Sequence, residues 1–141
     1  MLLITHALAT AFLAGLIWVV QMVHYPLMAE VGHGRYRSYH SAHIDRITKV
    51  VAPAMLFEAA TALWILVAPP DGVDPSSSRL AFAMVVAIWT STAALSVPAH
   101  RTLADRFDPA AHQFLVSTNW PRTILWTLRT VIAASWLALA S

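Results

Sequence analysis

Histidines gather near the ends of apolar stretches in this chain. Four of the seven histidines are placed in this way: His24, His40, His43 and His100. His40 and His43 are three residues apart, so in a helix both imidazoles project from one face and can reach one site. Imidazole is a common ligand of transition metals, which need three or more donors that converge from different elements. The pattern therefore predicts a transition-metal site built from these four side chains.

His40 and His43 also belong to a longer stripe. His33, Tyr36, His40, His43 and Ile47 recur at spacings of three and four residues, which is one face of a helix. Arginines on the other faces indicate an amphipathic helix at a membrane surface, where guanidinium groups reach lipid phosphates. This arrangement turns the histidine face inward.

A b-type haem is the alternative cofactor. Two histidines such as His24 and His100 would then act as the axial ligands of the iron.

Other polar residues lie inside or beside the apolar stretches. They are Gln21, Glu58, His112, Asn119 and Arg129. Glu58 and Arg129 are the two charges deep in these stretches, where an ionisable residue costs at least about 2.5 kcal/mol and normally finds a partner. We therefore expect the two to pair, either as a structural clamp or as part of a functional site. Gln21 lies one turn from His24 and is expected on the same face.

The composition is that of a membrane protein. Of 141 residues, 58% are hydrophobic and 11% are charged, against about 25% charged in a soluble domain. Apolar stretches near 20 residues can cross a bilayer, and they must be helical there because lipid offers backbone groups no partner. Four such spans are expected, at about 2–25, 47–68, 80–99 and 121–140. The chain has no cysteine, so thiolate ligands are excluded.

We therefore expect one all-α domain over residues 1–141: an integral membrane up-down four-helix bundle with amphipathic cytoplasmic connecting helices. The second connecting helix is expected from Pro109 to about 118, with Asp108 as its N-cap. Pro121 would then open the fourth span or kink it away from this helix.

Near two segments, "VPAHRTL" and "TNWPRT", the chain resembles the anthrone-oxygenase-like group of small four-helix membrane proteins. That group has a Pro-x-Asn-x-x-Leu pattern at the end of its third helix, matched here by Pro98 and Leu103, with His100 in place of asparagine. Asn119, Trp120 and Arg122 match in part the cluster that begins its last helix. The resemblance implies the same architecture, and a few members are linked to oxygenation of polyketide-like aromatics.

The predicted function is a site lined by histidine, glutamate and arginine that opens to the cytoplasm and binds a metal or a small amphiphile. An oxidoreductase is the enzyme class it suggests. A haem carrier and a non-catalytic structural or accessory subunit stay as alternatives. The expected partners are the lipid bilayer and a lipid-like ligand. The basic residues do not imply nucleic acid, and the oligomeric state stays open.

Basic residues lie mainly in the first and third connections, at about 29–46 and 100–120. The positive-inside rule places both of these in the cytoplasm of a cell-membrane protein and both termini outside. We expect an impermeant maleimide added to intact cells to label a single cysteine at position 76 but not one at position 33. Labelling of position 33 from outside would reverse the topology.

Overall fold

The computed structural model describes residues 1–139, apart from the side chain of His33. The predicted stripe can therefore be followed from Tyr36 onward, and position 140 of the fourth predicted span lies outside the described residues. The elements in chain order are α1 (Leu2–Val19), a π-helical turn η1 (Val20–His24), α2 (Tyr25–Met28), α3 (His33–Val67), α4 (Pro75–Ser91), a second π-helical turn η2 (Thr92–Ser96), α5 (Val97–Thr102) and α6 (Pro109–Leu139). No strand occurs in residues 1–139, so the all-α prediction is confirmed.

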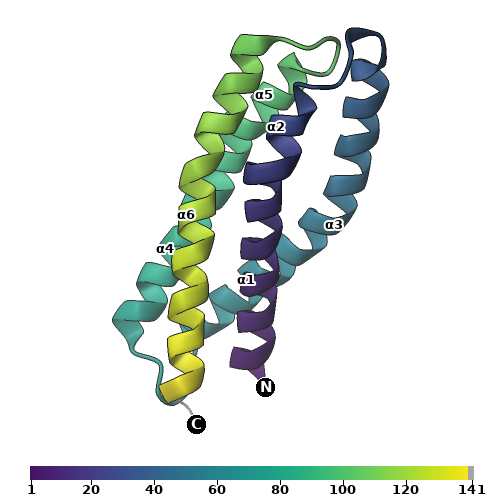
Figure 1. Cartoon of the computed structure of the whole chain (residues 1–141). Coiled ribbons are helices and arrows are strands. Elements are labelled where there is room, and N and C mark those ends of the chain that lie inside the picture. Colours follow the sequence, from purple (N-terminus) through teal and green to yellow (C-terminus); the bar gives the residue numbers. More distant parts are fainter. Residues whose placement is uncertain (140–141) are drawn as a thin grey trace.

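The chain runs the length of the molecule four times (Figure 1). α1, η1 and α2 form the first continuous rod, and α4, η2 and α5 form the third. Both ends of the described chain lie at one end of the molecule with the 68–74 connection. The 29–32 and 103–108 connections lie at the opposite end.

Neither expected connecting helix is a separate element. α3 continues without a break from His33 to Val67, and α6 continues from Pro109 through Pro121. A proline removes only one backbone hydrogen bond, while α6 packs along α1 and α4, and this packing holds the helix together. The predicted N-cap is confirmed, because the Ala111 amide donates to Asp108 Oδ1 at 2.7 Å.

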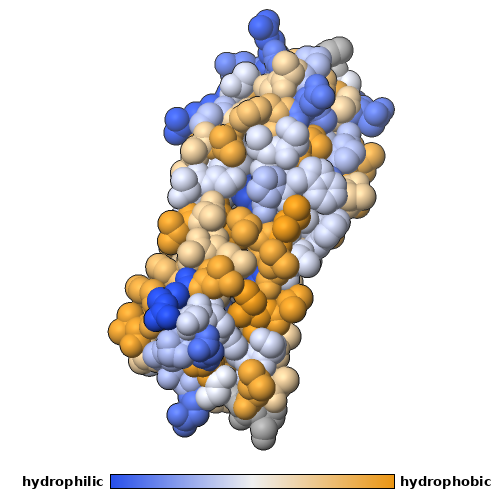
Figure 2. Space-filling model, turned by 90° about the vertical axis from the view of Figure 1, so that its left-hand side faces the viewer, coloured by the Kyte–Doolittle hydropathy of each residue, from blue (hydrophilic) through white to orange (hydrophobic). Residues whose placement is uncertain are grey.

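Three of the rods are long and apolar enough to cross a membrane: Leu2–Met28, Gly34–Val67 and Pro75–Thr102. α6 is long enough but less apolar, because it carries Arg122, Arg129 and several hydroxyl groups. Figure 2 shows hydrophobic residues over the middle of one face and hydrophilic residues gathered towards its ends. This distribution suits a molecule with an apolar belt.

α3 is bent. It contains Pro53, and a proline inside a helix removes a hydrogen bond and kinks the axis. α3 packs on α1 and α4, and Figure 1 shows its N-terminal half standing apart from α5. This N-terminal half of α3 carries His40 and His43.

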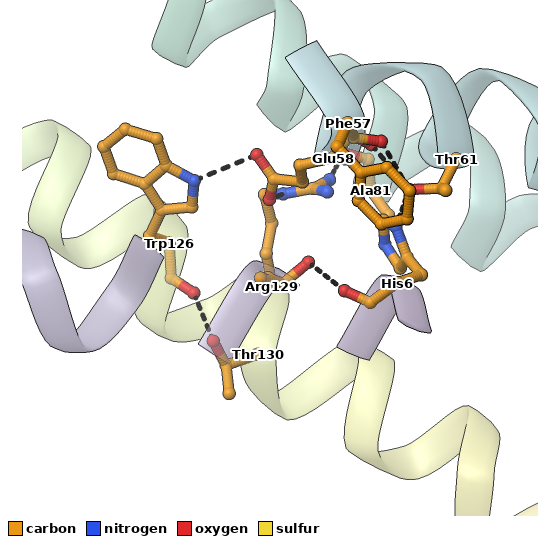
Figure 3. A network of polar contacts seen from close by, with 9 residues as sticks. His6, Phe57, Glu58, Thr61, Ala81, Trp126, Arg129 and Thr130 are labelled. Carbon is orange, nitrogen blue, oxygen red and sulfur yellow. Dashed lines mark hydrogen bonds and ion pairs between the residues drawn. The ribbon is translucent and has the colours of Figure 1, made fainter. Parts of the chain in front are cut away.

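A buried ion pair connects α3 to α6 (Figure 3). Arg129 Nε donates to Glu58 Oε1 at 3.0 Å, and both side chains are 1% exposed. The Trp126 indole donates to the other carboxylate oxygen at 3.1 Å. Arg129 also donates to the carbonyl oxygen of Ala81 in α4. The predicted pairing of Glu58 with Arg129 is confirmed, and it joins three helices.

The same network reaches α1. Thr61 lies one turn beyond Glu58, and its hydroxyl is 2.8 Å from His6 Nδ1. The His6 ring stacks on Trp136 of α6, with ring centroids 6.1 Å apart. The end of the molecule that holds the termini is therefore tied together by polar contacts between all four rods.

We expect Glu58→Gln and Arg129→Gln each to destabilise the protein strongly, because each leaves an uncompensated buried charge. Removing one member of a buried pair typically costs about 3–5 kcal/mol, and replacing both is much milder. The double variant should therefore unfold in detergent at a higher temperature than additivity of the singles predicts. Arg37→Gln is the control, because the Arg37–Asp105 pair is exposed and 3.9 Å long. Additive effects in the cycle would contradict the coupling.

Candidate functional site

A cleft of about 840 Å³ lies between the N-terminal half of α3 and the η2–α5 segment, with α1 and α6 contributing to its walls. Its polar lining includes Tyr25, His40, His43, His100 and Arg122. The rest of its surface is largely apolar, with Leu16, Val20, Ile47, Val51, Met55, Trp89, Val97 and Trp126 among the lining residues. The cleft therefore offers a small group of polar side chains to a ligand that is otherwise apolar.

The four histidines predicted as ligands lie in one cluster. His24 comes from η1, His40 and His43 from α3, and His100 from α5. The rings of His24 and His43 stack with centroids 4.1 Å apart, and the centroids of His43 and His100 are 6.0 Å apart. Their proximity, inferred from spacing and helix ends, is found in the structure. Their role as metal ligands stays a prediction.

Hydrogen bonds connect three side chains of the cluster in a row. His40 Nε2 is 3.2 Å from His100 Nδ1, and His100 Nε2 is 3.2 Å from the Tyr25 hydroxyl. Either nitrogen of a neutral imidazole can carry the proton. Two arrangements of the protons satisfy this row. In the first, Tyr25 donates to His100 and His100 donates to His40. In the second, His40 donates to His100 and His100 donates to Tyr25. All three of these side chains line the cleft.

The histidine nitrogens do not converge on a common point. Among the described residues, no three His, Asp or Glu side chains have the geometry of a metal site. Both nitrogens of His100 are engaged, while the buried Nε2 of His24 has no hydrogen-bond partner within residues 1–139. A metal ion would therefore require the rings to rotate.

Two π-helical turns lie directly beside the cluster. In each turn the residue before a proline donates its amide proton five residues back, Tyr25 to the Val20 carbonyl and Val97 to the Thr92 carbonyl. The prolines that follow, Pro26 and Pro98, have no amide proton and crowd the preceding turn. Such turns occur frequently at functional sites. Here they set the direction in which His24 and His100 leave their rods.

Gln21 belongs to a different set of contacts from His24, contrary to the prediction that both share a face. The Gln21 side-chain oxygen accepts from Asn119 Nδ2 at 2.7 Å, and its amide nitrogen lies 3.3 Å from the Val116 carbonyl oxygen. His24 instead stacks on His43 of α3. The wider π-helical turn between the two residues changes the angle between them, because the α-helical period no longer applies.

Asn119 continues this set of contacts to Arg122. Its side-chain oxygen accepts a hydrogen bond from an Arg122 terminal nitrogen. The other terminal nitrogen of Arg122 donates to the Thr92 hydroxyl at 3.3 Å. Gln21, Asn119 and Arg122 therefore form a buried polar row that ends at the wall of the cleft.

The remaining predicted site residues lie outside the histidine cluster. His112 Nε2 is 2.8 Å from the carbonyl oxygen of Tyr25, and its ring lies beside Phe107. Glu58 and Arg129 do not line the cleft. They are separated from it by Trp126, which lines the cleft and donates to Glu58. The single site that was expected from histidine, glutamate and arginine is therefore divided into two groups, the histidine cluster and the Glu58–Arg129 pair. Trp126 lies between them.

Three residues of the cleft were not predicted as site residues: Tyr25, Arg122 and Trp126. Arg122 could have been found from its spacing, because it lies seven residues before Arg129 and therefore on the same face of α6. Tyr25 lies between His24 and Pro26 in the sequence. Nothing in its sequence context indicates that its hydroxyl meets His100.

No family model matches the chain, and neither a curated protein nor a solved structure matches it. The resemblance to the anthrone-oxygenase-like group therefore stays a prediction. What the chain does has to be argued from its own cleft.

Proposed function

We propose that this protein is an integral membrane four-helix bundle in which α6 is the fourth span. Three rods have the length and hydropathy for spanning. Large apolar side chains are exposed along them, including Leu8, Phe12, Leu56, Leu63 and Trp64. A soluble monomer rarely exposes so much apolar surface, whereas lipid would cover it. Both basic connections then lie on the cytoplasmic side and the termini lie outside.

We further propose that the protein binds a small amphiphile in the cleft. The observation that carries this proposal is the lining itself: polar side chains from α2, α3, α5 and α6 meet at one part of a largely apolar cleft. Its volume of about 840 Å³ lies within the range of small-molecule sites, about 300–1,000 Å³. The head of an amphiphile would contact the histidines, and its apolar part would lie along Val20, Ile47 and Trp89.

Filling the cleft should abolish binding. Ala93 lines it, whereas the next residue, Ala94, is equally exposed and does not. We expect Ala93→Trp to lose binding of radiolabelled dodecan-1-ol by detergent-solubilised protein, and Ala94→Trp to bind like the unmodified protein. Both variants add the same bulk to the same π-helical turn, so the pair separates occupancy of the cleft from disturbance of the helix. Unchanged binding by Ala93→Trp would place the amphiphile elsewhere.

A metal at the histidine cluster is the second candidate. One observation favours it: the four predicted ligands belong to three different rods and lie in one cluster. Rotation of the rings would bring nitrogens together for tetrahedral coordination. An oxidoreductase with a transition metal is the enzyme class that fits this candidate. Haem held by His24 and His100 stays as its alternative.

Titration with Zn²⁺ tests the metal candidate. We expect one ion to bind, and His40→Ala and His100→Ala each to abolish binding. His112→Ala is the matched control, because that ring contacts Tyr25 and Phe107 rather than the cluster. Metal ligands must be deprotonated, so binding should weaken as the pH is lowered and the imidazoles take up protons. A Soret band in the purified protein would favour haem instead, and no bound ion under any condition would exclude the metal site.

A further inference from the structure

Arg122 is a buried cation at the wall of the cleft with only neutral partners. Its side chain is 6% exposed, and it donates to the amide oxygen of Asn119 and to the hydroxyl of Thr92. The Tyr25 hydroxyl is a further neutral partner of the guanidinium. Its Nε has no hydrogen-bond partner within the described part of the chain. Over residues 1–139 the ion pairs are Arg129–Glu58 and Arg37–Asp105, so no carboxylate meets this guanidinium.

Such a site is electrostatically incomplete. An arginine keeps its proton in proteins, and a charge taken out of water without a counter-charge is costly. Glu58 of α3 is a buried carboxylate that faces α6. However, its two oxygens already accept hydrogen bonds from Trp126 and Arg129. The charge that would balance Arg122 therefore has to come from outside the chain.

The charged residues around the cleft indicate the size of the negative charge that would balance Arg122. Three arginines and two aspartates line it: Arg37, Arg101, Arg122, Asp45 and Asp105. Arg37 and Asp105 lie within 3.9 Å of each other and are exposed at the mouth. Arg101 and Asp45 are also exposed and of opposite sign. When the histidines are neutral, the lining therefore carries a net charge of +1. Arg122 is the buried arginine among these residues.

We propose that the occupant of the cleft is an anionic amphiphile whose head group carries a single negative charge, such as a carboxylate, and pairs with Arg122. This inference rests on the proposed function and names the ligand class of the same site. Arg122 lines the cleft, and its guanidinium gives a charge-assisted hydrogen bond to the anion. Tyr25, His40 and His100 line the same cleft, and the apolar lining takes the chain or ring system of the ligand.

Three probes of equal chain length test the proposal: dodecanoate, dodecan-1-ol and dodecyltrimethylammonium. Binding of each radiolabelled probe is measured on the full chain in a non-ionic detergent. A charged hydrogen bond is worth roughly tenfold or more in affinity, so the unmodified protein should prefer dodecanoate to dodecan-1-ol by about that factor and bind the cation most weakly. Arg122→Gln should remove the preference for dodecanoate and keep the affinity for dodecan-1-ol. Arg106→Gln changes an exposed arginine of the 103–108 connection that does not line the cleft, so it is the matched control and should keep the preference.

The outcomes separate this inference from the proposed function. If the unmodified protein binds dodecanoate and dodecan-1-ol equally, the anionic ligand class is wrong and the amphiphile cleft stands. If it binds none of the probes, both are wrong. A preference for dodecanoate that survives Arg122→Gln also overturns the inference, because another group would then hold the anion. If Arg122→Gln does not fold, the order of the three probes on the unmodified protein decides, and equal affinity for the anion and the cation refutes the proposal.

Discussion

The carboxylate of Glu58 sets a constraint that the surrounding helices have to meet. A charge inside an apolar protein is tolerated only where donors surround it, and here the donors come from α6. Arg129 and Trp126 each give one hydrogen bond to a carboxylate oxygen, and Arg129 also donates to the carbonyl oxygen of Ala81. These contacts fix α3, α4 and α6 relative to one another at the end of the molecule where α3 packs closely. The other half of α3 is then free to diverge beyond its bend, and the cleft exists because of that divergence.

Two buried arginines of α6 have different partners: one pairs with a carboxylate and the other contacts neutral groups. Arg122 and Arg129 are seven residues apart, which is about 10 Å along the axis of α6. Both are buried in the same stripe, with Trp126 between them. Arg129 has a carboxylate and completes a structural contact, whereas Arg122 meets the neutral side chains of Asn119, Thr92 and Tyr25. The first therefore completes a contact between helices, and the second is the group to which we propose that an anionic ligand binds.

Much of this arrangement was predictable from the sequence, for identifiable reasons. Apolar length predicted the rods, and the cost of deep charges predicted the Glu58–Arg129 pair. The spacing of His40 and His43 predicted their shared face. The bend of α3 and the two π-helical turns were not predicted, because a proline inside an apolar stretch is compatible with several backbone responses. Packing against neighbouring rods selects among these responses, and one sequence contains no direct record of that packing. For the same reason the sequence did not predict that Gln21 and His24 would separate, or that Tyr25 would meet His100.

The π-helical turns have a consequence for how this chain tolerates changes in its length. A π-helical turn is an α-helix that accommodates one additional residue, and one residue corresponds to about 100° of rotation about the helix axis. Loss of a single residue from Val20–His24 or Thr92–Ser96 would let the rod return to an ordinary α-helical period. The rod would still form, and because the π-helical turn takes up that rotation locally, the parts of the rod on its two sides would keep nearly the same orientation relative to each other. Related chains that differ here by one residue would therefore keep the same four rods with the same sides facing one another, and the change would be confined to the side chains of the turn beside the cleft.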